Sequence, residues 1–332
     1  MKTCSIMVQT LCVPCCNRCR YCLLSWDGKL PGAEYERSEA YAAAFHAWLR
    51  QNRPDLSFGF SFGYSMEHPA LFRAIDFMRS IGSPGGKFLQ MDGMRMRRDD
   101  QLEQLMVGLR DHGIVTLNYT FYGTEAYHDA FAGRRGDHAL LLRSAKTALA
   151  AGLHVTAGIP VTRENALQAD KLLSLLSQAG IRECRFFIPH EEGRGELLHE
   201  IRCRTEELHC WSDAALSRLN RKLYRTEAEW IREKPAPPEN RMLLLSLRKD
   251  NIDHFENNGF SSTIRELEEL DDAYYAAFPS FSELADRYGK PESTELFSLH
   301  DLNMRYRRQY LTETNMPIHD ATDETRCSSR RY

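Results

Sequence analysis

Five cysteines lie within eleven positions of this chain, in the stretch CVPCCNRCRYC at residues 12–22. Thiolates on one short loop can bind a metal ion or an iron–sulfur cluster, because the loop wraps them around a single site. In a chain of 332 residues, such crowding indicates metal binding or redox chemistry rather than a disulfide framework. Burial as small hydrophobic residues is a poor explanation beside the polar neighbours Asn17, Arg18 and Arg20.

The spacing of the cysteines separates the possible sites. A zinc site made of two CxxC pairs would use Cys12, Cys15, Cys19 and Cys22. Only three residues separate the two pairs, fewer than zinc-binding sequences usually have. A bacterial ferredoxin pattern that starts at Cys16 fails, because its fourth cysteine would fall on Trp26. The remaining set, in the pattern C-x3-C-x2-C, is Cys15, Cys19 and Cys22.

The elements that must position this loop alternate between strands and helices. Apolar, strand-like runs lie at residues 4–11, 56–63, 87–91, 115–123, 154–161 and 184–189. Helical patterns follow at residues 33–51, 68–82, 97–113, 136–152 and 162–180. This alternation predicts an α/β fold of parallel βα units, in which functional groups sit at the carboxyl ends of the strands. The cysteine loop directly follows the first strand and therefore occupies such a position.

The pattern changes near residue 200. A helical pattern covers residues 205–231, a proline-rich breaker covers 233–240, and 241–247 is one more strand-like run. We therefore predict two parts, a βα part over 1–200 and a mostly helical extension over 201–332 that caps the first part or selects its substrate.

Composition adds little about partners. A formal net charge of -3 gives no basic field, so nucleic acid is unsupported as a partner. The opening MKTCSIMVQTL is typical neither of a secretory signal nor of a membrane span. We therefore expect a cytoplasmic protein without a membrane partner.

The motif CCNRCRYC resembles the cysteine loop of the radical S-adenosylmethionine (radical SAM) superfamily, in which an aromatic residue, here Tyr21, precedes the last cysteine. The resemblance implies a partial (β/α)6 TIM-like barrel and a [4Fe–4S] cluster held by Cys15, Cys19 and Cys22. It also implies S-adenosylmethionine (SAM) on the fourth iron, and a reducing partner such as flavodoxin or ferredoxin. A competing frame of Cys12, Cys16 and Cys19 puts Arg18 at the aromatic position, so we expect Cys12 and Cys16 to be neighbours rather than ligands.

The resemblance covers roughly residues 4 to 195. Asp92 with Gly93 resembles an asparagine–glycine pair that the family often has after its third strand. After the fourth strand the family has a glycine, a histidine–aspartate pair and a glycine-containing loop. Here these features fall on Gly123, on His128 with Asp129, and on Gly133.

One departure concerns the second strand, which in this family usually ends in Gly-Gly-Glu-Pro and holds the SAM ammonium group. This chain has FGYSMEHP at residues 62–69, which puts Tyr64 at the glutamate position and Glu67 three positions out of register. Backbone carbonyls from Gly63 to Ser65 are then expected to accept from the ammonium group. An ordinary strand-to-helix turn capped by Ser65 is the alternative.

Other polar residues at strand ends are open to two interpretations. Asn118 and Thr120 share one face of the fourth strand, where they contact SAM or substrate, or simply satisfy each other inside the barrel. Arg163 binds a carboxylate or begins a solvated helix, and His190 is placed to contact substrate. The loop with Arg134 and Arg135 faces either the mouth of the barrel or solvent, and the sequence favours solvent.

The extension vaguely resembles a SPASM domain, the cysteine-rich region that binds auxiliary clusters in peptide-modifying members of the superfamily. Its cysteine ligands are missing, because the chain after the sixth strand has only three cysteines, so we expect one cluster. These thiols are either buried or able to return a hydrogen atom to a substrate radical; they are Cys203, Cys210 and Cys327.

Two functions follow from these features. The first is a radical SAM enzyme that modifies a peptide, through maturation of a ribosomally made precursor, or a small metabolite. The second is a non-catalytic iron–sulfur or zinc protein with a regulatory or partner-binding role on an inherited barrel. The altered second strand favours the second function, whereas the three-cysteine loop favours the first, because a structural site would gain from a fourth thiolate.

Overall fold

The computed structural model describes residues 1–10, 15–22, 32–61, 63, 66–190, 193–236, 239–315 and 328–331. Six strands alternate with helices in the first part, as the sequence predicts. The strands are β1 (Lys2–Thr10), β2 (Ser57–Ser61), β3 (Phe88–Gln90), β4 (Thr116–Thr120), β5 (His154–Pro160) and β6 (Glu183–Phe187). The helices that follow them are α1 (Tyr35–Asn52), α2 (Leu71–Ser80), α3 (Asp99–Asp111), α4 (Glu125–Ala132), α5 (Asp137–Ala150) and α6 (Ala169–Gln178).

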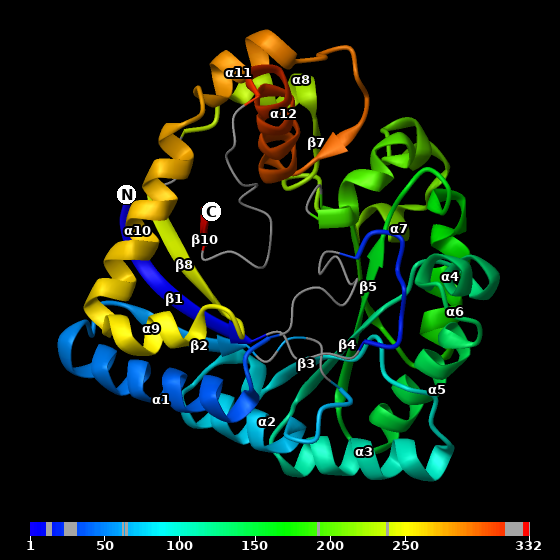
Figure 1. The fold of residues 1–332 in the computed structure, drawn as a ribbon. Coiled ribbons are helices and arrows are strands. Elements are labelled where there is room, and N and C mark those ends of the chain that lie inside the picture. The colour runs from blue at the N-terminus through cyan, green and yellow to red at the C-terminus, as the bar shows by residue number, and fades with distance from the viewer. Residues whose placement is uncertain are drawn as a thin grey trace.

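The parallel strands follow chain order around an arc, with the helices on its outer side (Figure 1). β3, β4, β5 and β6 form one four-stranded sheet, while β1 and β2 belong to a second. A short 3-10 helix, η1 (Pro84–Gly86), lies between β2 and β3 and contacts both. The fold is therefore α/β with parallel sheets, and the predicted partial (β/α)6 barrel is confirmed.

The apolar run near residue 245 is also a strand, β8 (Asn240–Leu247), and it joins the barrel. β8 pairs in parallel with β1, with Leu243 opposite Ile6 and Leu245 opposite Val8. All four of these side chains are buried in the main hydrophobic core. A further strand, β10 (Ser328–Arg331), pairs antiparallel with β8. The C-terminal part of the chain therefore extends the sheet that contains β1.

The helical pattern predicted over residues 205–231 does not form one helix. The stretch divides into η4 (Glu206–Cys210), α7 (Asp213–Leu216), β7 (Arg225–Thr226) and α8 (Glu227–Glu233), after η3 (Gly193–Ile201). Two tryptophans fix separate parts of it, because the indole N–H of Trp211 donates to the Ala166 carbonyl and that of Trp230 donates to the Phe297 carbonyl. These two anchors lie on different elements, which a straight helix cannot reach together.

The remainder of the described extension is mostly helical. It contains α9 (Ile252–Asn258), α10 (Phe260–Ala276), α11 (Phe281–Tyr288), β9 (Leu296–Phe297) and α12 (Leu299–Thr314). The short strand β9 pairs antiparallel with β7. In Figure 1, α8, α11 and α12 lie toward the open side of the arc of strands. None of the helices in the described ranges is long and apolar enough to cross a lipid bilayer.

A buried ion cluster joins β8 to α10. The guanidinium of Arg241, 4% exposed, donates to Asp271 Oδ2 at 3.0 Å and to Asp272 Oδ1 at 2.7 Å. The Asp271 side chain is itself only 2% exposed, whereas Asp272 is 58% exposed. Burial lowers the pKa of Arg241, but the hydrogen bonds that it donates to these two carboxylates, with their charges, outweigh it and raise the pKa above its ordinary value. The cluster therefore holds a charged arginine inside the protein.

We expect Arg241→Ala to destabilise the protein by about 3 to 5 kcal/mol, because it leaves the buried Asp271 carboxylate without its cation. The matched control is Arg265→Ala on the same helix as Asp271, where the ion pair with Glu269 is more than 70% exposed. That control should cost at most about 0.5 kcal/mol. Urea unfolding of both variants measures the difference, and equal midpoints would contradict a structural role for the buried cluster.

Candidate functional site: the cysteine loop

Residues 15–22 run along the carboxyl ends of β3 and β4 and are tied down by backbone hydrogen bonds. The Cys16 N–H donates to the Gly93 carbonyl at 2.8 Å. The Arg18 and Arg20 N–H groups donate to the carbonyls of Ala132 and Phe131 at 2.8 and 3.0 Å. The loop is therefore held from two sides, by the turn after β3 and by the end of α4.

Gly93 leaves room for the side chain of Cys15, the first of the three cysteines. Its φ of 72° lies in the left-handed region, and a Cβ built on it would lie 2.2 Å from Cys15 Sγ. The thiol of Cys15 therefore occupies the space that any other residue at position 93 would fill. The Asp92–Gly93 pair that the sequence singled out thus lies against the loop, as expected from its position after the third strand.

Cys19 lies among aromatic rings. The Tyr122 hydroxyl donates to Cys19 Sγ at 3.1 Å. The Tyr21 ring meets the Tyr122 ring edge-on, with centroids 5.8 Å apart, and lies 5.7 Å from the Phe131 ring. Cys19 and Tyr21 pack against a small apolar cluster formed by Tyr122, Phe131, Ala132 and Leu198. One side of the loop is therefore apolar, apart from one hydroxyl aimed at a sulfur.

The three thiols named by the sequence interact electrostatically. Burial, together with the charges of Asp92, Cys15 and Cys22, raises the pKa of Cys19 to about 12, against the lowering effect of the Tyr122 hydrogen bond. Burial also raises the pKa of Cys15, to which the charges of Cys22, Asp92 and Cys16 add. Their sulfurs are close enough to repel one another as thiolates, and a cationic centre among them would remove that repulsion.

A buried polar network beneath the loop was not predicted. Asn17 Nδ2 donates to Asp137 Oδ2 at 2.9 Å, and His128 Nε2 lies 3.1 Å from the same oxygen. His128 Nδ1 accepts the Tyr122 N–H, so Nε2 carries the proton and donates to Asp137. Arg134 Nη1 donates to Asn17 Oδ1 at 3.1 Å, and its side chain is only 12% exposed.

This network corrects one expectation and shows how a residue pair that the sequence singled out is used. Arg134 lies under the cysteine loop rather than in solvent. His128 and Asp129 act separately: His128 binds Asp137, while Asp129 Oδ1 accepts the His138 N–H at the start of α5. Asparagine and aspartate are common residue types, so the sequence did not single out Asn17 or Asp137. The adjacent His128 and Asp129 were the sequence feature that indicated this region.

The strand-end residues Asn118 and Thr120 bind their neighbours. Asn118 Nδ2 donates to Gln90 Oε1 at 2.7 Å, and the Thr156 hydroxyl donates to Asn118 Oδ1 at 2.7 Å. The Thr120 N–H donates to Asp92 Oδ1 at 2.8 Å. Burial raises the pKa of Asp92 to about 6, although the hydrogen bonds that its carboxylate accepts act to lower it. Both predicted residues therefore belong to a polar layer next to the cysteine loop, and their contact with SAM or substrate stays a prediction.

The second-strand residues are only partly described. Tyr64 and Ser65 lie outside the described residues, and the Gly63 N–H lies 3.5 Å from Ser61 Oγ. Glu67 is engaged elsewhere, because both of its carboxylate oxygens accept from Arg97, at 2.6 and 3.0 Å. Glu67 is therefore committed to an ion pair with Arg97, and the role of the Gly63 carbonyl stays a prediction.

Arg163, Cys203 and Cys210 are further predicted residues that the structure describes. The Arg163 N–H donates to the Ile201 carbonyl, and its Nε is buried with no acceptor among the described residues. Cys203 is fully buried in the main core, and burial raises its pKa to about 12. Cys210 is exposed and donates to the Glu207 carbonyl. Cys12 and Cys327 lie outside the described residues. Hydrogen return by any of these thiols stays a prediction.

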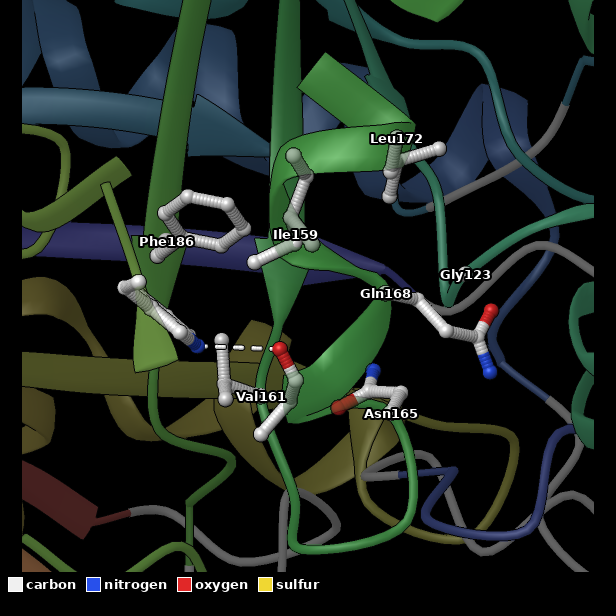
Figure 2. A pocket seen from close by; sticks show the side chains of 10 residues that line it. Gly123, Ile159, Val161, Asn165, Gln168, Leu172 and Phe186 are labelled. Carbon is white, nitrogen blue, oxygen red and sulfur yellow. Dashed lines mark hydrogen bonds between the residues drawn. The ribbon is translucent and has the colours of Figure 1, made fainter. Parts of the chain in front are cut away.

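A small cavity next to β5 is apolar and separate from the loop. It is lined by Ile159, Val161, Leu172, Phe186 and Trp211, with the Asn165 and Gln168 side chains on one side (Figure 2). Its space is sufficient for about one water molecule. The cavity is therefore a packing gap rather than a substrate site.

The ligand atoms that the loop offers, and their arrangement, indicate which kind of metal centre it can bind. Within the described ranges, no three side chains of His, Cys, Asp or Glu converge closely enough to hold a single metal ion. In an iron–sulfur cubane each thiolate binds a different iron, so the sulfurs surround the cluster instead of meeting at one ion. Free thiols at Cys15, Cys19 and Cys22 on one loop, with Gly93 making room for the first, fit a cluster better than a zinc ion.

Comparisons with known proteins give distant similarities only. No protein-family model matches the sequence, and no curated protein matches it. Among solved structures, the chain is similar to SuiB of Streptococcus suis bound to the precursor peptide SuiA, at 11% identity and a TM-score of 0.42. It is also similar to anSMEcpe with bound AdoMet, at 15% identity and a TM-score of 0.42. A third is coproporphyrinogen III oxidase (HemN) from Escherichia coli, described as a radical SAM enzyme, at 11% identity and a TM-score of 0.44.

The extent of these similarities differs. The SuiB match covers 57% of this chain and 40% of SuiB, and the anSMEcpe match covers 56% and 52%. The HemN match covers 92% of this chain and 74% of HemN. The chain thus spans about half the length, or less, of the first two proteins, and the similarities concern the course of the chain rather than a shared substrate.

We expect Tyr122→Phe to lower the reduction potential of a reconstituted cluster, because a hydrogen bond to a ligand sulfur stabilises the more negative, reduced form. A loss of about 1 kcal/mol of this stabilisation corresponds to roughly 40 mV. Redox titration monitored by electron paramagnetic resonance measures the shift. The control is Tyr127→Phe in the same aromatic group, whose hydroxyl donates to Glu164. Equal potentials in the two variants would show that Tyr122 does not bond to a ligand sulfur.

Proposed function

We propose that this protein is a radical SAM enzyme whose cluster is held by Cys15, Cys19 and Cys22. The observation that carries the proposal is the three-thiol loop at the carboxyl end of β1, with Cys15 seated against Gly93 and with Tyr122 bound to Cys19. Held there, a [4Fe–4S] cluster would supply the electron that splits SAM into methionine and a 5′-deoxyadenosyl radical, which abstracts hydrogen from a substrate.

The residues around the loop each have a role in this proposal. Asn17, through Asp137 and His128, fixes the middle of the loop, so that the sulfurs are held before the cluster binds. Tyr21 and Phe131 exclude water from one side of the loop, which protects a reactive radical. Tyr21, Gly63, Asn118, Thr120 and Arg163 are the described residues proposed to bind the cofactors, together with Tyr64 and Ser65.

The substrate is proposed to be a peptide or a small metabolite, and the electron donor a flavodoxin or ferredoxin. SuiB is described in complex with its precursor peptide, which supports a peptide as the first substrate class to test. The extension would select that substrate, because α8, α11 and α12 lie toward the open side of the barrel (Figure 1).

The second candidate function is a non-catalytic iron–sulfur or zinc protein. The observation that favours it is Glu67, the carboxylate nearest the expected SAM-binding motif, which is occupied by Arg97. On this alternative the loop binds its metal but SAM is not cleaved.

Formation of 5′-deoxyadenosine separates the two functions. The protein is purified without oxygen, reconstituted with iron and sulfide, and incubated with SAM and dithionite. Product that disappears in Cys19→Ala supports the enzyme. A fully assembled cluster that binds no SAM and forms no product supports the alternative.

A further inference from the structure

A group of exposed arginines lies beside the cysteine loop. The segment after β3, the turn between α4 and α5, the start of α5 and the cysteine loop itself contribute to it. An exposed methionine, Met96, lies among them. We call this methionine and the exposed arginines the basic face; the arginines are Arg18, Arg95, Arg98, Arg135 and Arg143.

Close contacts join the parts of the basic face. A Cβ built on Gly136 would lie 3.4 Å from Met96 Cε, so the methionine lies against the turn between α4 and α5. A Cβ built on Gly133 in the same turn would lie 2.8 Å from the Arg18 carbonyl oxygen. The turn therefore contacts both the segment after β3 and the cysteine loop, and the basic face is continuous.

Two exposed carboxylates lie on the basic face, and each already faces an arginine. Asp99 Oδ1 lies 3.5 Å from Arg143, and Asp100 Oδ1 lies 3.1 Å from Arg98. The Arg143 guanidinium also donates to the Arg97 carbonyl at 2.6 Å, which ties α5 to the segment after β3. These two carboxylates therefore offset two of the five exposed arginines.

The charge that remains on the basic face is positive. Glu67 is only 10% exposed and is shared by Arg95 and the buried Arg97, at 3.1 and 2.6 Å. Arg18 and Arg135 form no ion pair with a carboxylate in the part of the chain that the structure describes. This local excess of positive charge occurs in a chain whose formal net charge is -3.

The opposite side of the molecule is acidic. The helix α10 has five carboxylates and a single arginine. Glu269 and Asp272 on this helix are 72% and 58% exposed. In Figure 1, α10 lies at the left of the view, whereas α4 and α5 lie at the right. A negatively charged protein is repelled from the first side and attracted to the second, so the charge distribution would turn it toward the basic face.

We propose that the basic face is the docking surface for an acidic electron-carrier protein. The inference rests on the proposed function, because the cluster must receive an electron before SAM is cleaved. Arg18 lies between Cys15 and Cys19 in the loop and donates to the Cys15 carbonyl at 3.0 Å, so a protein docked here lies close to the proposed ligands. In each turnover the carrier is oxidised by one electron, which the cleavage of SAM consumes, and docking itself forms and breaks no covalent bond.

The make-up of the basic face suits a transient protein partner. Met96 is 50% exposed and has arginines around it, which is an apolar centre with a charged rim. Methionine adapts its shape to different surfaces. Electron-transfer complexes have small interfaces, so a face of this extent is sufficient for one. A nucleic acid would be attracted by the charge alone and would gain little from the methionine.

The test is binding of purified flavodoxin, an acidic flavin protein, to the reconstituted protein, measured by biolayer interferometry without oxygen. We expect the dissociation constant of the wild type to rise about tenfold between about 0.01 M and about 0.3 M salt, because salt screens exposed charges. The double variant Arg95→Glu with Arg135→Glu should raise it about tenfold at the lower salt concentration, because two attractions become two repulsions.

The matched control is the double variant Arg50→Glu with Arg182→Glu, which changes the net charge by the same amount. Arg50 is exposed in the last turn of α1, and Arg182 is exposed immediately before β6. Both lie at the amino ends of the strands, at the opposite end of the barrel from the cysteine loop. This control should bind flavodoxin within about twofold of the wild type.

Equal binding by the two double variants would show that the inference is wrong. So would wild-type binding that salt does not change, a comparison that needs no variant and stands even if a charge reversal prevents folding. Binding of a labelled single-stranded RNA, without binding of flavodoxin, would assign the basic face to nucleic acid and overturn the inference as well.

Formation of 5′-deoxyadenosine with dithionite reports separately on the proposed function, because this small reductant needs no docking surface. The product should form equally in the wild type and in both double variants. Product with dithionite but charge-independent binding of flavodoxin would overturn this inference alone. Charge-dependent binding of flavodoxin without any product would support the docking surface and count against the enzyme.

Discussion

Alanine at position 15, 19 or 22 is expected to reduce bound iron from about four atoms per chain to almost none. Each substitution removes one of only three thiolates that the proposed cluster has. Formation of 5′-deoxyadenosine should fall with it to roughly the background without enzyme. Iron and sulfide analysis after reconstitution, together with the visible absorbance of the cluster, measures the first effect.

Cys16→Ala is the matched control for this series. Cys16 is the immediate neighbour of Cys15, is half-buried like it, and binds Gly93 through its backbone N–H rather than its thiol. The control should therefore retain the cluster. A full cluster in Cys22→Ala combined with loss in Cys16→Ala would transfer the ligand role to the competing frame of Cys12, Cys16 and Cys19.

Gly93→Ala is expected to prevent assembly of the cluster although it changes no ligand. The new methyl group would lie 2.2 Å from Cys15 Sγ, so the thiol or the turn after β3 must move. The backbone must in addition hold alanine at a φ of 72°, which costs about 1 kcal/mol. Iron content after reconstitution should fall at least tenfold, while circular dichroism should show a protein that remains folded.

Gly82→Ala separates the clash with Cys15 from the cost of the backbone conformation. Gly82 has a φ of 73°, almost that of Gly93, but a Cβ there has no heavy atom within 4 Å. This variant should lose about 1 kcal/mol of stability and keep its cluster. If Gly93→Ala also keeps a full cluster, the placement of Cys15 against Gly93 is not required for binding, and the loop has another way to present its first thiol.

The sequence predicted the alternation of strands and helices because each element depends on residues that are close together in the chain. The apolar run at 154–161 and the helical periodicity at 162–180 come from neighbours in the chain. β5 matches the first run within one residue, whereas α6 begins at Ala169, seven residues after the predicted start, and follows the 3-10 helix η2 (Ala166–Gln168). The predicted helix over 205–231 is wrong because contacts with distant residues decide the structure there. Trp211 and Trp230 dock on Ala166 and Phe297, and such distant partners leave no periodic trace in the sequence.

The candidate site likewise has some features that the sequence shows and others that only the folded chain shows. The cysteine spacing and the Asp92–Gly93 turn are short-range patterns, so the sequence alone identified the residues of the loop. The hydroxyl of Tyr122 on Cys19 joins residues 103 positions apart, and Asn17 meets Asp137 across 120 positions. Tyrosine, asparagine and aspartate are common, and nothing near them in the chain distinguishes these three from others of their kind.

By itself the sequence determined the parallel βα units and predicted both the three thiols and the end of the strands at which we propose the chemistry, because cysteine spacing and periodicity are properties of neighbouring residues. Tertiary structure alone decided that β8 pairs with β1, that Arg134 lies beneath the loop, and that His190 after β6 contacts Asp301 of α12. These contacts depend on folding that brings distant, individually ordinary residues together, and burial then gives their charges and hydrogen bonds a strength that they lack in water.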